Sequence, residues 1–244
     1  MSFARSKQRV EAAPCWLLHS YPYKETSLII EVLSRQQGRV ALVARGARRP
    51  TSGLRGSLLA FQPLEASWFG TGDLKTLHAA EWQGGVPQLA GLPLICGFYL
   101  NELLLKLLPR EDAHPGLFDA YGRAVRALAQ CPQEVEPILR RFELTLLTEM
   151  GYGFALDKDA AGQSISKEAE YRFLAGRGIV PAFNLPSGMG VPLSGRSLAA
   201  MASGDYNEPQ AAQQAKHLMR VLLAELLGEA PLHTRKILRD LHKL

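Results

Sequence analysis

The stretch RGARRPTSGLRG, from Arg45 to Gly56, gathers residues that can bind an anion. It holds four arginines, three glycines and a proline, and it contains no acidic residue. A guanidinium group suits phosphate, because its planar fork donates two parallel hydrogen bonds and stays charged. The glycines let the backbone approach a phosphate closely. This composition favours a grip on a nucleic-acid backbone. The alternatives are an anion-binding loop of an enzyme and a solvated loop that only adds charge.

Residues 45–56, named here the arginine loop, lie in a wider basic region. The window from Val32 to Leu64 contains six arginines and no acid, and residues 1–82 carry 11 Lys and Arg against 6 Asp and Glu. A surface of this kind neutralises phosphates without reading bases, so its binding depends on salt. The candidate nucleic-acid-binding residues are Tyr23, Lys24, Arg39, Arg45, Arg48, Arg49, Arg55 and Lys75.

The spacing of these cations predicts where they lie. Arg39 and Arg45 are six residues apart, so they point to the same side of an extended strand. We expect Arg45 to lie on that strand, in a fixed position. Arg48, Arg49 and Arg55 are expected on a flexible loop that becomes ordered when DNA binds.

Two aromatic pairs are candidates for stacking on bases, which a single-strand binder requires. Tyr21 and Tyr23 flank a proline, whereas Trp68 and Phe69 end an apolar segment before a glycine. Either pair is a possible platform. The apolar setting favours Trp68 and Phe69 as core residues and leaves Tyr21 and Tyr23 exposed.

A second arginine pair, Arg140 and Arg141, lies in the helical segment ILRRFELTLL. One arginine can flank an apolar groove while the other points to solvent, an arrangement that suits a peptide with an acidic stretch and an apolar end. The alternative is a helix surface on which Arg141 pairs with Glu136 or Glu143. The helical pattern alone favours the surface, and both arginines remain candidates for binding a partner's tail.

Signatures of catalysis and of cofactors are missing from the sequence. The six histidines are scattered, without an i, i+4 pair, and neither GxxxxGK[ST] nor GxSxG occurs. The three cysteines are far apart, without a CxxC pair, which indicates neither a zinc site nor a disulfide framework. The basic N-terminus precedes no apolar signal segment, and no apolar run reaches 18 residues. We therefore expect a cytoplasmic protein that is not an enzyme, with no cofactor, no metal and no membrane partner.

The elements that must position the cations begin with short strands. The first third contains apolar segments at about ten-residue spacing, separated by glycine turns, which is typical of a small closed barrel. An oligonucleotide-binding (OB) barrel of five strands and an SH3-like barrel both fit this pattern. We assign the barrel to residues 1–82, of which 1–13 form a basic tail.

Helical periodicity replaces the strands after Pro87. Three amphipathic segments predict a helical domain over residues 83–152, and the third of them ends at Gly151. Residues 153–206 are less regular: EYRFLAGRGIVPAFN indicates a hairpin that turns at GRG, and LPSGMGVPLSG is interpreted as a loop. Residues 207–244 begin with a long amphipathic helix that is expected to rejoin the helical domain. The predicted fold class is α+β and multidomain.

Several of these motifs, taken in order, resemble the bacterial recombination-repair family RecO. YKETSLIIEVLSRQQGRVALVARGARR is similar to the family's first strands and basic loop, and LKTLHAAEW is similar to its barrel-closing strand. YLNELLLKLLP and LRRFELTLLTEMGYG resemble its helices, and LHTRKILRDL resembles its closing helix. The main matches run from Tyr23 to Gly153, over half of the chain.

The resemblance implies an OB domain, a helical domain and an insertion that in many members holds zinc with four cysteines. Residues 153–206 contain no cysteine, so we predict no metal there. It also implies binding of single- and double-stranded DNA, strand annealing, loading of the RecA recombinase onto strands coated by single-stranded DNA-binding protein, and a nucleoid-associated location. RecR is the further implied partner, and the coating protein's acidic tail would suit Arg140, with Arg141 behind it. The rival functions are an OB-fold RNA-binding factor, a protein-only adaptor and a hydrolase.

Overall fold

The computed structural model describes residues 9–186, 188–228 and 232–241. The chain forms two compact units. Unit 1 comprises Met1–Gln133 and Leu232–Leu244, and unit 2 comprises Glu134–Pro231. Of the expected basic tail, residues 1–8 lie outside the described residues, whereas residues 9–13 belong to the first strand. The sequence analysis divides the chain into four segments, which is a finer division than these two units, and the boundaries of the four segments stay a prediction.

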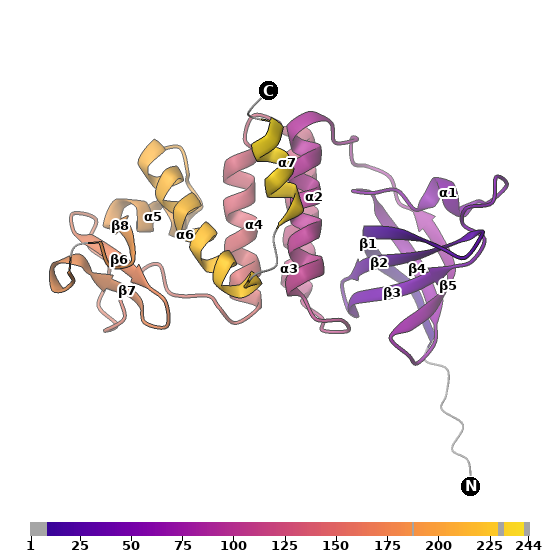
Figure 1. The fold of residues 1–244 in the computed structure, drawn as a ribbon, viewed down its shortest axis with the longest axis horizontal. Coiled ribbons are helices and arrows are strands. Elements are labelled where there is room, and N and C mark those ends of the chain that lie inside the picture. Colours follow the sequence, from indigo (N-terminus) through magenta and orange to yellow (C-terminus); the bar gives the residue numbers. More distant parts are fainter. Residues whose placement is uncertain (1–8, 187, 229–231, 242–244) are drawn as a thin grey trace, which may run out of the picture. The chain divides into compact units, whose positions relative to one another are not determined.

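Five strands form a closed barrel in unit 1 (Figure 1). They are β1 (Arg9–Tyr23), β2 (Ser27–Ser34), β3 (Gly38–Ala44), β4 (Pro63–Phe69) and β5 (Leu74–Trp82). The order around the barrel is β1-β2-β3-β5-β4, and β4 returns to pair with β1. The β3–β5 pair is parallel, and the other pairs are antiparallel. This order is that of the OB fold, so the predicted five-stranded barrel is confirmed.

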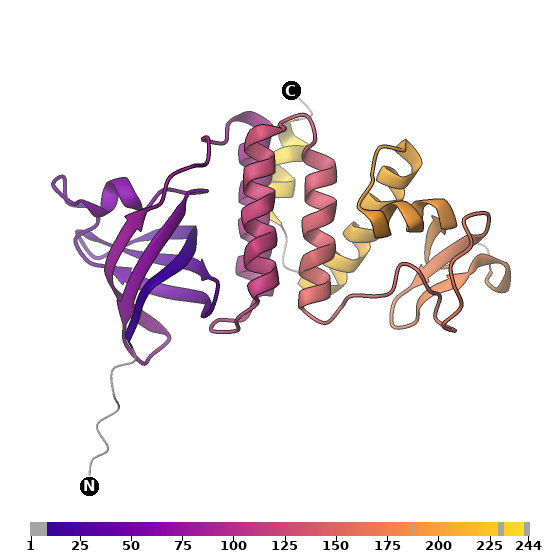
Figure 2. The ribbon, with the colours of Figure 1, turned by 180° about the vertical axis from the view of Figure 1, so that it is seen from behind.

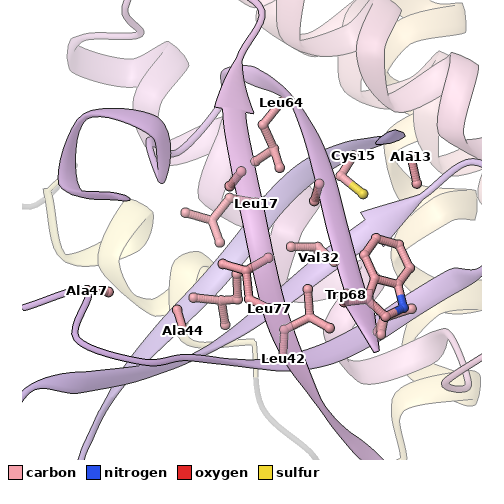
Figure 3. Packing of buried hydrophobic residues seen from close by; sticks show 14 residues of the cluster. Ala13, Cys15, Leu17, Val32, Leu42, Ala44, Ala47, Leu64, Trp68 and Leu77 are labelled. Carbon is pink, nitrogen blue, oxygen red and sulfur yellow. The ribbon is translucent and has the colours of Figure 1, made fainter. Parts of the chain in front are cut away.

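Strand alternation fills the barrel (Figure 3). Val40, Leu42 and Ala44 of β3 point inward, where they join Trp68, whose side chain is 1% exposed. The preference for Trp68 as a core residue is therefore confirmed. For Phe69 the same preference is wrong: Phe69 is half-buried and lies outside the core cluster, because strand alternation turns it to the opposite face from Trp68, where its ring lies 6.5 Å from that of His78. A helical turn, α1 (Leu54–Ser57), forms the end of the arginine loop before β4 and carries Arg55. The sequence analysis did not predict α1, because a turn of four residues is too short to show helical periodicity.

Three helices complete unit 1, namely α2 (Gly91–Leu107), α3 (Pro115–Gln130) and α7 (His233–Leu241). Helix α2 packs against both α3 and α7 (Figure 1, Figure 2). The Asn101 side chain joins α2 to the barrel and to α3: its Nδ2 donates to the Leu18 carbonyl at 2.8 Å, and its Oδ1 accepts from the Tyr121 hydroxyl at 2.6 Å. The buried amide thus fixes helices to strands.

The Glu102 carboxylate caps the start of α7. It accepts hydrogen bonds from the backbone N–H groups of His233 and Thr234, at 2.8 and 3.0 Å, and from the Thr234 hydroxyl at 2.7 Å. Partial burial of Glu102 works against its charged form, but these donors outweigh burial and hold the pKa of Glu102 below its ordinary value.

Unit 2 combines a small sheet with three helices. Its elements are α4 (Val135–Glu149), β6 (Glu170–Leu174), β7 (Gly178–Pro181), the 3₁₀ turn η1 (Ala182–Asn184), β8 (Val191–Ser194), α5 (Gly195–Ser203) and α6 (Pro209–Leu227). The sheet order is β7-β6-β8, so the expected hairpin is present, with its turn around Gly176. The interpretation of LPSGMGVPLSG as a loop is wrong in part, because β8 arises there. Four residues including a proline give too little alternation to reveal a strand.

The C-terminal segment divides between the units. Helix α6 packs against α4 in unit 2, and α7 packs against α2 in unit 1. Both are contacts with predicted helices of the helical domain. A single amphipathic pattern after residue 207 did not reveal that the segment serves two units.

The insertion in unit 2 is closed by carboxylate and ring contacts. Asp159 Oδ1 accepts from the N–H groups of Ala161 and Gln163, both at 2.9 Å. The rings of Phe154 and Phe173 lie 5.1 Å apart between centroids. Within the described ranges, no group of three or more His, Cys, Asp and Glu side chains is placed to hold a metal. No helix in the same ranges is long and apolar enough to cross a membrane.

Candidate nucleic-acid interface

The arginine loop meets the β1–β2 turn at one end of the barrel. Strand pairing sets this meeting, since Leu28 near the start of β2 lies opposite Ala44 at the end of β3. Two hydrogen bonds then join the connections: the Arg48 N–H donates to the Thr26 carbonyl at 2.8 Å, and the Arg48 guanidinium donates to the Glu25 carbonyl at 3.3 Å. Two segments some 20 residues apart in the chain therefore form one surface.

The backbone of the arginine loop is anchored rather than free. Ala47 is 2% exposed and belongs to the barrel core. Gly46 has a φ of +68°, a conformation that glycine adopts without strain, and the Arg49 N–H donates to the Gly46 carbonyl at 3.0 Å. Strand β3 ends at Ala44, so the expectation that Arg45 lies on the strand is wrong. Arg45 begins the turn, because the chain must bend there to bury Ala47.

The charged ends of the loop arginines face solvent. Arg45, Arg48, Arg49 and Arg55 are all exposed. Within the part of the chain that the structure describes, none of these four guanidiniums takes part in an ion pair. Their charge is thus available to an outside anion. A cluster of exposed positive charges of this kind attracts anions.

Aromatic side chains lie on the last residues of β1, next to the β1–β2 turn. Tyr21 is 44% exposed, as expected, whereas the expectation that Tyr23 is exposed is wrong, because Tyr23 is half-buried. Lys24 Nζ lies 5.4 Å from the centroid of the Tyr23 ring, and the ring of His19 meets that of Tyr21 edge-on at 4.3 Å. Rings and cations on one face are what a single strand needs, since bases stack while phosphates pair.

Arg39 differs from the loop arginines in its contacts. Its Nε donates to the Leu108 carbonyl at 2.9 Å, and its Nη1 lies 3.4 Å from Glu31 Oε2. Arg110 pairs with the same Glu31 carboxylate, which is only 3% exposed. Burial lowers the pKa of Arg39, although the neighbouring Glu31 charge acts in the opposite direction. The guanidinium of Arg39 therefore joins β3 to the segment after α2 and is not presented to a ligand.

Glycine makes that junction possible. Gly38 has a φ of +65°, and a Cβ at this position would lie 2.0 Å from the Asp112 carbonyl oxygen. The Glu111 N–H donates to the Arg39 carbonyl at 3.0 Å. Lys75 is similarly engaged, since it is 6% exposed, pairs with Glu111 and donates to the Gly72 carbonyl. The structure thus brings together six of the eight candidates, and it places Arg39 and Lys75 elsewhere.

The second arginine pair has a different setting in unit 2. Arg140 is 9% exposed, and its Nη2 donates to Glu143 Oε1 at 2.9 Å. Arg141 is exposed, and its Nε donates to the Gly204 carbonyl at 2.9 Å. The ion pair expected between Arg141 and Glu136 or Glu143 does not form, because Glu143 pairs with Arg140 and Glu136 pairs with Lys216. Arg141 is therefore the arginine that a partner can reach.

The fold and the site together define an OB-fold protein whose barrel carries a basic, aromatic surface suited to nucleic acid. Comparison with known proteins names the family. Residues 11–85 match the family model "Recombination protein O N terminal", and residues 91–236 match "Recombination protein O C terminal". The chain belongs to the RecO family, whose members take their name from DNA repair by recombination.

Curated relatives agree over nearly the full length. DNA repair protein RecO of Aromatoleum aromaticum is 48% identical over 240 residues, which cover 98% of this chain and 99% of the relative. DNA repair protein RecO of Nitrosospira multiformis is 51% identical over 239 residues, which cover 98% of each chain. The resemblance drawn from the motifs is confirmed.

Proposed function

We propose that this protein binds single- and double-stranded DNA without sequence preference through the barrel end formed by the arginine loop and the β1–β2 turn. It anneals complementary strands and helps to load RecA onto DNA coated by single-stranded DNA-binding protein. The observation that carries the proposal is the group of four exposed loop arginines, none of which forms an ion pair with another described residue. Its setting is cytoplasmic and nucleoid-associated.

Annealing needs no bond to be made or broken. Two strands approach against the mutual repulsion of their phosphates, and a basic surface lowers that repulsion by replacing counterions. Contacts to phosphate position a strand without reading it, so the bases remain available to a complementary strand. We propose on this ground that the protein acts as a mediator and not as a catalyst of covalent chemistry.

The test replaces Arg45, Arg48 and Arg49 by alanine. Because each phosphate contact on a single strand contributes about 0.7 to the slope of log affinity against log salt, we expect the slope to fall by about 2. The matched control replaces Arg177, Arg196 and Arg220 of unit 2, which are also exposed. This control removes the same amount of positive charge as the loop variant. The proposal fails if the loop variant binds oligonucleotides as the parent does, or if the control loses as much. Competition with an RNA of the same sequence tests the RNA-binding alternative.

A partner contact is proposed for unit 2. The acidic tail of single-stranded DNA-binding protein would meet the exposed Arg141 on α4, and RecR and the RecA filament complete the partner set. What supports Arg141 over Arg140 is the latter's buried pairing with Glu143. We expect Arg141→Ala to weaken binding of the tail peptide while leaving DNA binding intact, and Arg220→Ala, on α6, to leave both unchanged. Unaltered peptide affinity in Arg141→Ala would remove this assignment.

A further inference from the structure

A hollow of about 400 Å³ opens beside the arginine loop. It is lined by Leu28, Ala47, Arg48, Leu54, Arg55 and Leu58. Ala47 belongs to the barrel core, and the three leucines pack against that core while remaining half-exposed. Four apolar side chains that belong to the barrel core or pack against it thus share the lining of the hollow with two exposed arginines, Arg48 and Arg55.

The fold assembles this hollow from three elements. Leu28 comes from the start of β2, where it pairs with Ala44. Leu54 opens α1 and Leu58 follows it, one turn apart, with the Leu58 N–H donating to the Leu54 carbonyl at 3.0 Å. This spacing sets both leucines on one side of the turn, while Arg55 follows Leu54 directly. The anchored backbone of the arginine loop supplies the last wall.

We infer that the hollow receives one unstacked base of a bound single strand, with Arg48 and Arg55 meeting the phosphates on either side of it. The inference rests on the proposed function, because it requires a strand on the arginine loop. A base is an uncharged, flat ring whose faces are apolar, and the backbone phosphates on either side of its nucleotide are negative, which matches a lining of apolar side chains and two arginines. Bases splayed from a strand are held by apolar side chains and guanidinium planes in this way.

An acidic peptide is the competing occupant, but its complementarity is weaker. In such a peptide the negative charges lie on one side of the apolar end. Arg48 lies in the turn after β3 and Arg55 lies on α1, and both line the same hollow. A base site has a consequence that a peptide site lacks. Duplex DNA keeps its bases stacked and paired, so the hollow distinguishes a single strand from a duplex by more than charge.

The experiment compares an ordinary oligonucleotide with an abasic strand of the same length, which has the same phosphates and no bases. We expect the unaltered protein to bind the abasic strand about tenfold more weakly, because base contacts on single strands are commonly of this size. Tyr21 and Tyr23 are also candidates for stacking on bases. A variant is therefore needed to measure how much of the preference for the ordinary strand comes from the hollow. Leu58→Ser is expected to reduce the preference about fivefold while its affinity for the abasic strand stays unchanged, and that unchanged affinity shows that the variant is folded.

The matched control is Leu92→Ser, which alters an equally apolar, 42% exposed side chain on α2 and should keep the full preference. Equal binding of both strands by the unaltered protein would overturn the base site and leave the proposed function standing. A full preference retained in Leu58→Ser would also overturn it, by assigning the bases to other residues. Competition by an acidic, apolar-ended peptide that Leu58→Ser abolishes, without any preference for bases, would give the hollow to a peptide. Failure to bind either strand would instead refute the proposed function.

Discussion

Two groups of arginines in this chain share their chemistry and differ in their surroundings. In the loop after β3, the guanidiniums are exposed and lie in no ion pair among the described residues. Arg39 and Arg140 are buried to a large extent and pair with Glu31 and Glu143, which are 3% and 0% exposed. An arginine that pairs with a buried carboxylate holds structural elements together, and its guanidinium is then not available to bind phosphate. A count of arginines therefore overestimates the positive charge available to a ligand unless the positions of the neighbouring carboxylates are known.

The two units repeat this contrast on a larger scale. Unit 1 carries 19 Lys and Arg against 11 Asp and Glu, a formal charge of +8. Unit 2 carries 9 against 12, a formal charge of −3. On net charge alone, unit 1 is the more attractive of the two units to a polyanion. The formal charge of the whole chain, +5, does not reveal this difference between the units.

The largest effect is expected from Arg140→Ala, which breaks the most buried pair. It removes the guanidinium that neutralises Glu143 in a site closed to water, so we expect a loss of about 3 kcal/mol in the free energy of unfolding. Urea denaturation measures it. Arg141→Ala, on the same helix turn and exposed, is the control and should change stability by less than about 1 kcal/mol. Equal losses in both variants would show that burial does not separate the two arginines.

A smaller effect is expected from Arg39→Ala, and it sharpens the comparison within unit 1. Glu31 keeps Arg110 but loses one charged donor, so unfolding should become easier by about 2 kcal/mol. Arg48→Ala should leave stability within about 1 kcal/mol of the parent and lower the affinity for DNA. Thermal unfolding and a salt titration of oligonucleotide binding measure the two properties. The distinction collapses if Arg39→Ala weakens DNA binding as much as Arg48→Ala does.

The smallest effect concerns a carboxylate that pairs with N–H groups. Glu102 has a lowered pKa, so its folded form holds fewer protons than its unfolded form between the two pKa values. The stability it adds is present above its ordinary pKa of 4.5 and is lost as the pH falls through the lowered folded value. We expect Glu102→Gln to flatten the decline in unfolding free energy below pH 4.5, measured by denaturation at several pH values. A decline as steep as that of the parent would exclude Glu102 as its source.

Much of the fold could be predicted from local patterns. Strand alternation around Val40 and Leu42 and the hairpin near Gly176 depend on neighbours in sequence, and the structure has both. The candidate interface was harder, since its members differ only in what lies beside them. Lys75 pairs with Glu111, 36 residues away, and no spacing rule links these positions. The pair of Arg140 and Glu143 was visible as an i, i+3 spacing, but its burial was not.

The hollow at the arginine loop had no sequence signal at all. Leu28, Leu54 and Leu58 are apolar residues in apolar segments, and only strand pairing and the unexpected turn α1 bring them together. Tertiary placement also explains why the arginine loop is anchored. A single alanine of the loop, Ala47, belongs to the barrel core. The sequence does not indicate this, because a small apolar residue in a polar loop is not part of any apolar pattern.

The cysteine-free insertion bears on the conditions under which such a protein works. Agents that oxidise thiolates dismantle a zinc knuckle by removing its ligands. In the insertion of this chain, the hydrogen bonds of Asp159 and the contact between the rings of Phe154 and Phe173 involve no sulfur atom. The barrel thiol is also protected, because burial raises the pKa of Cys15 to about 12 and keeps it protonated. Oxidation of thiols therefore has no target in unit 2, whose sulfur atoms all belong to methionines.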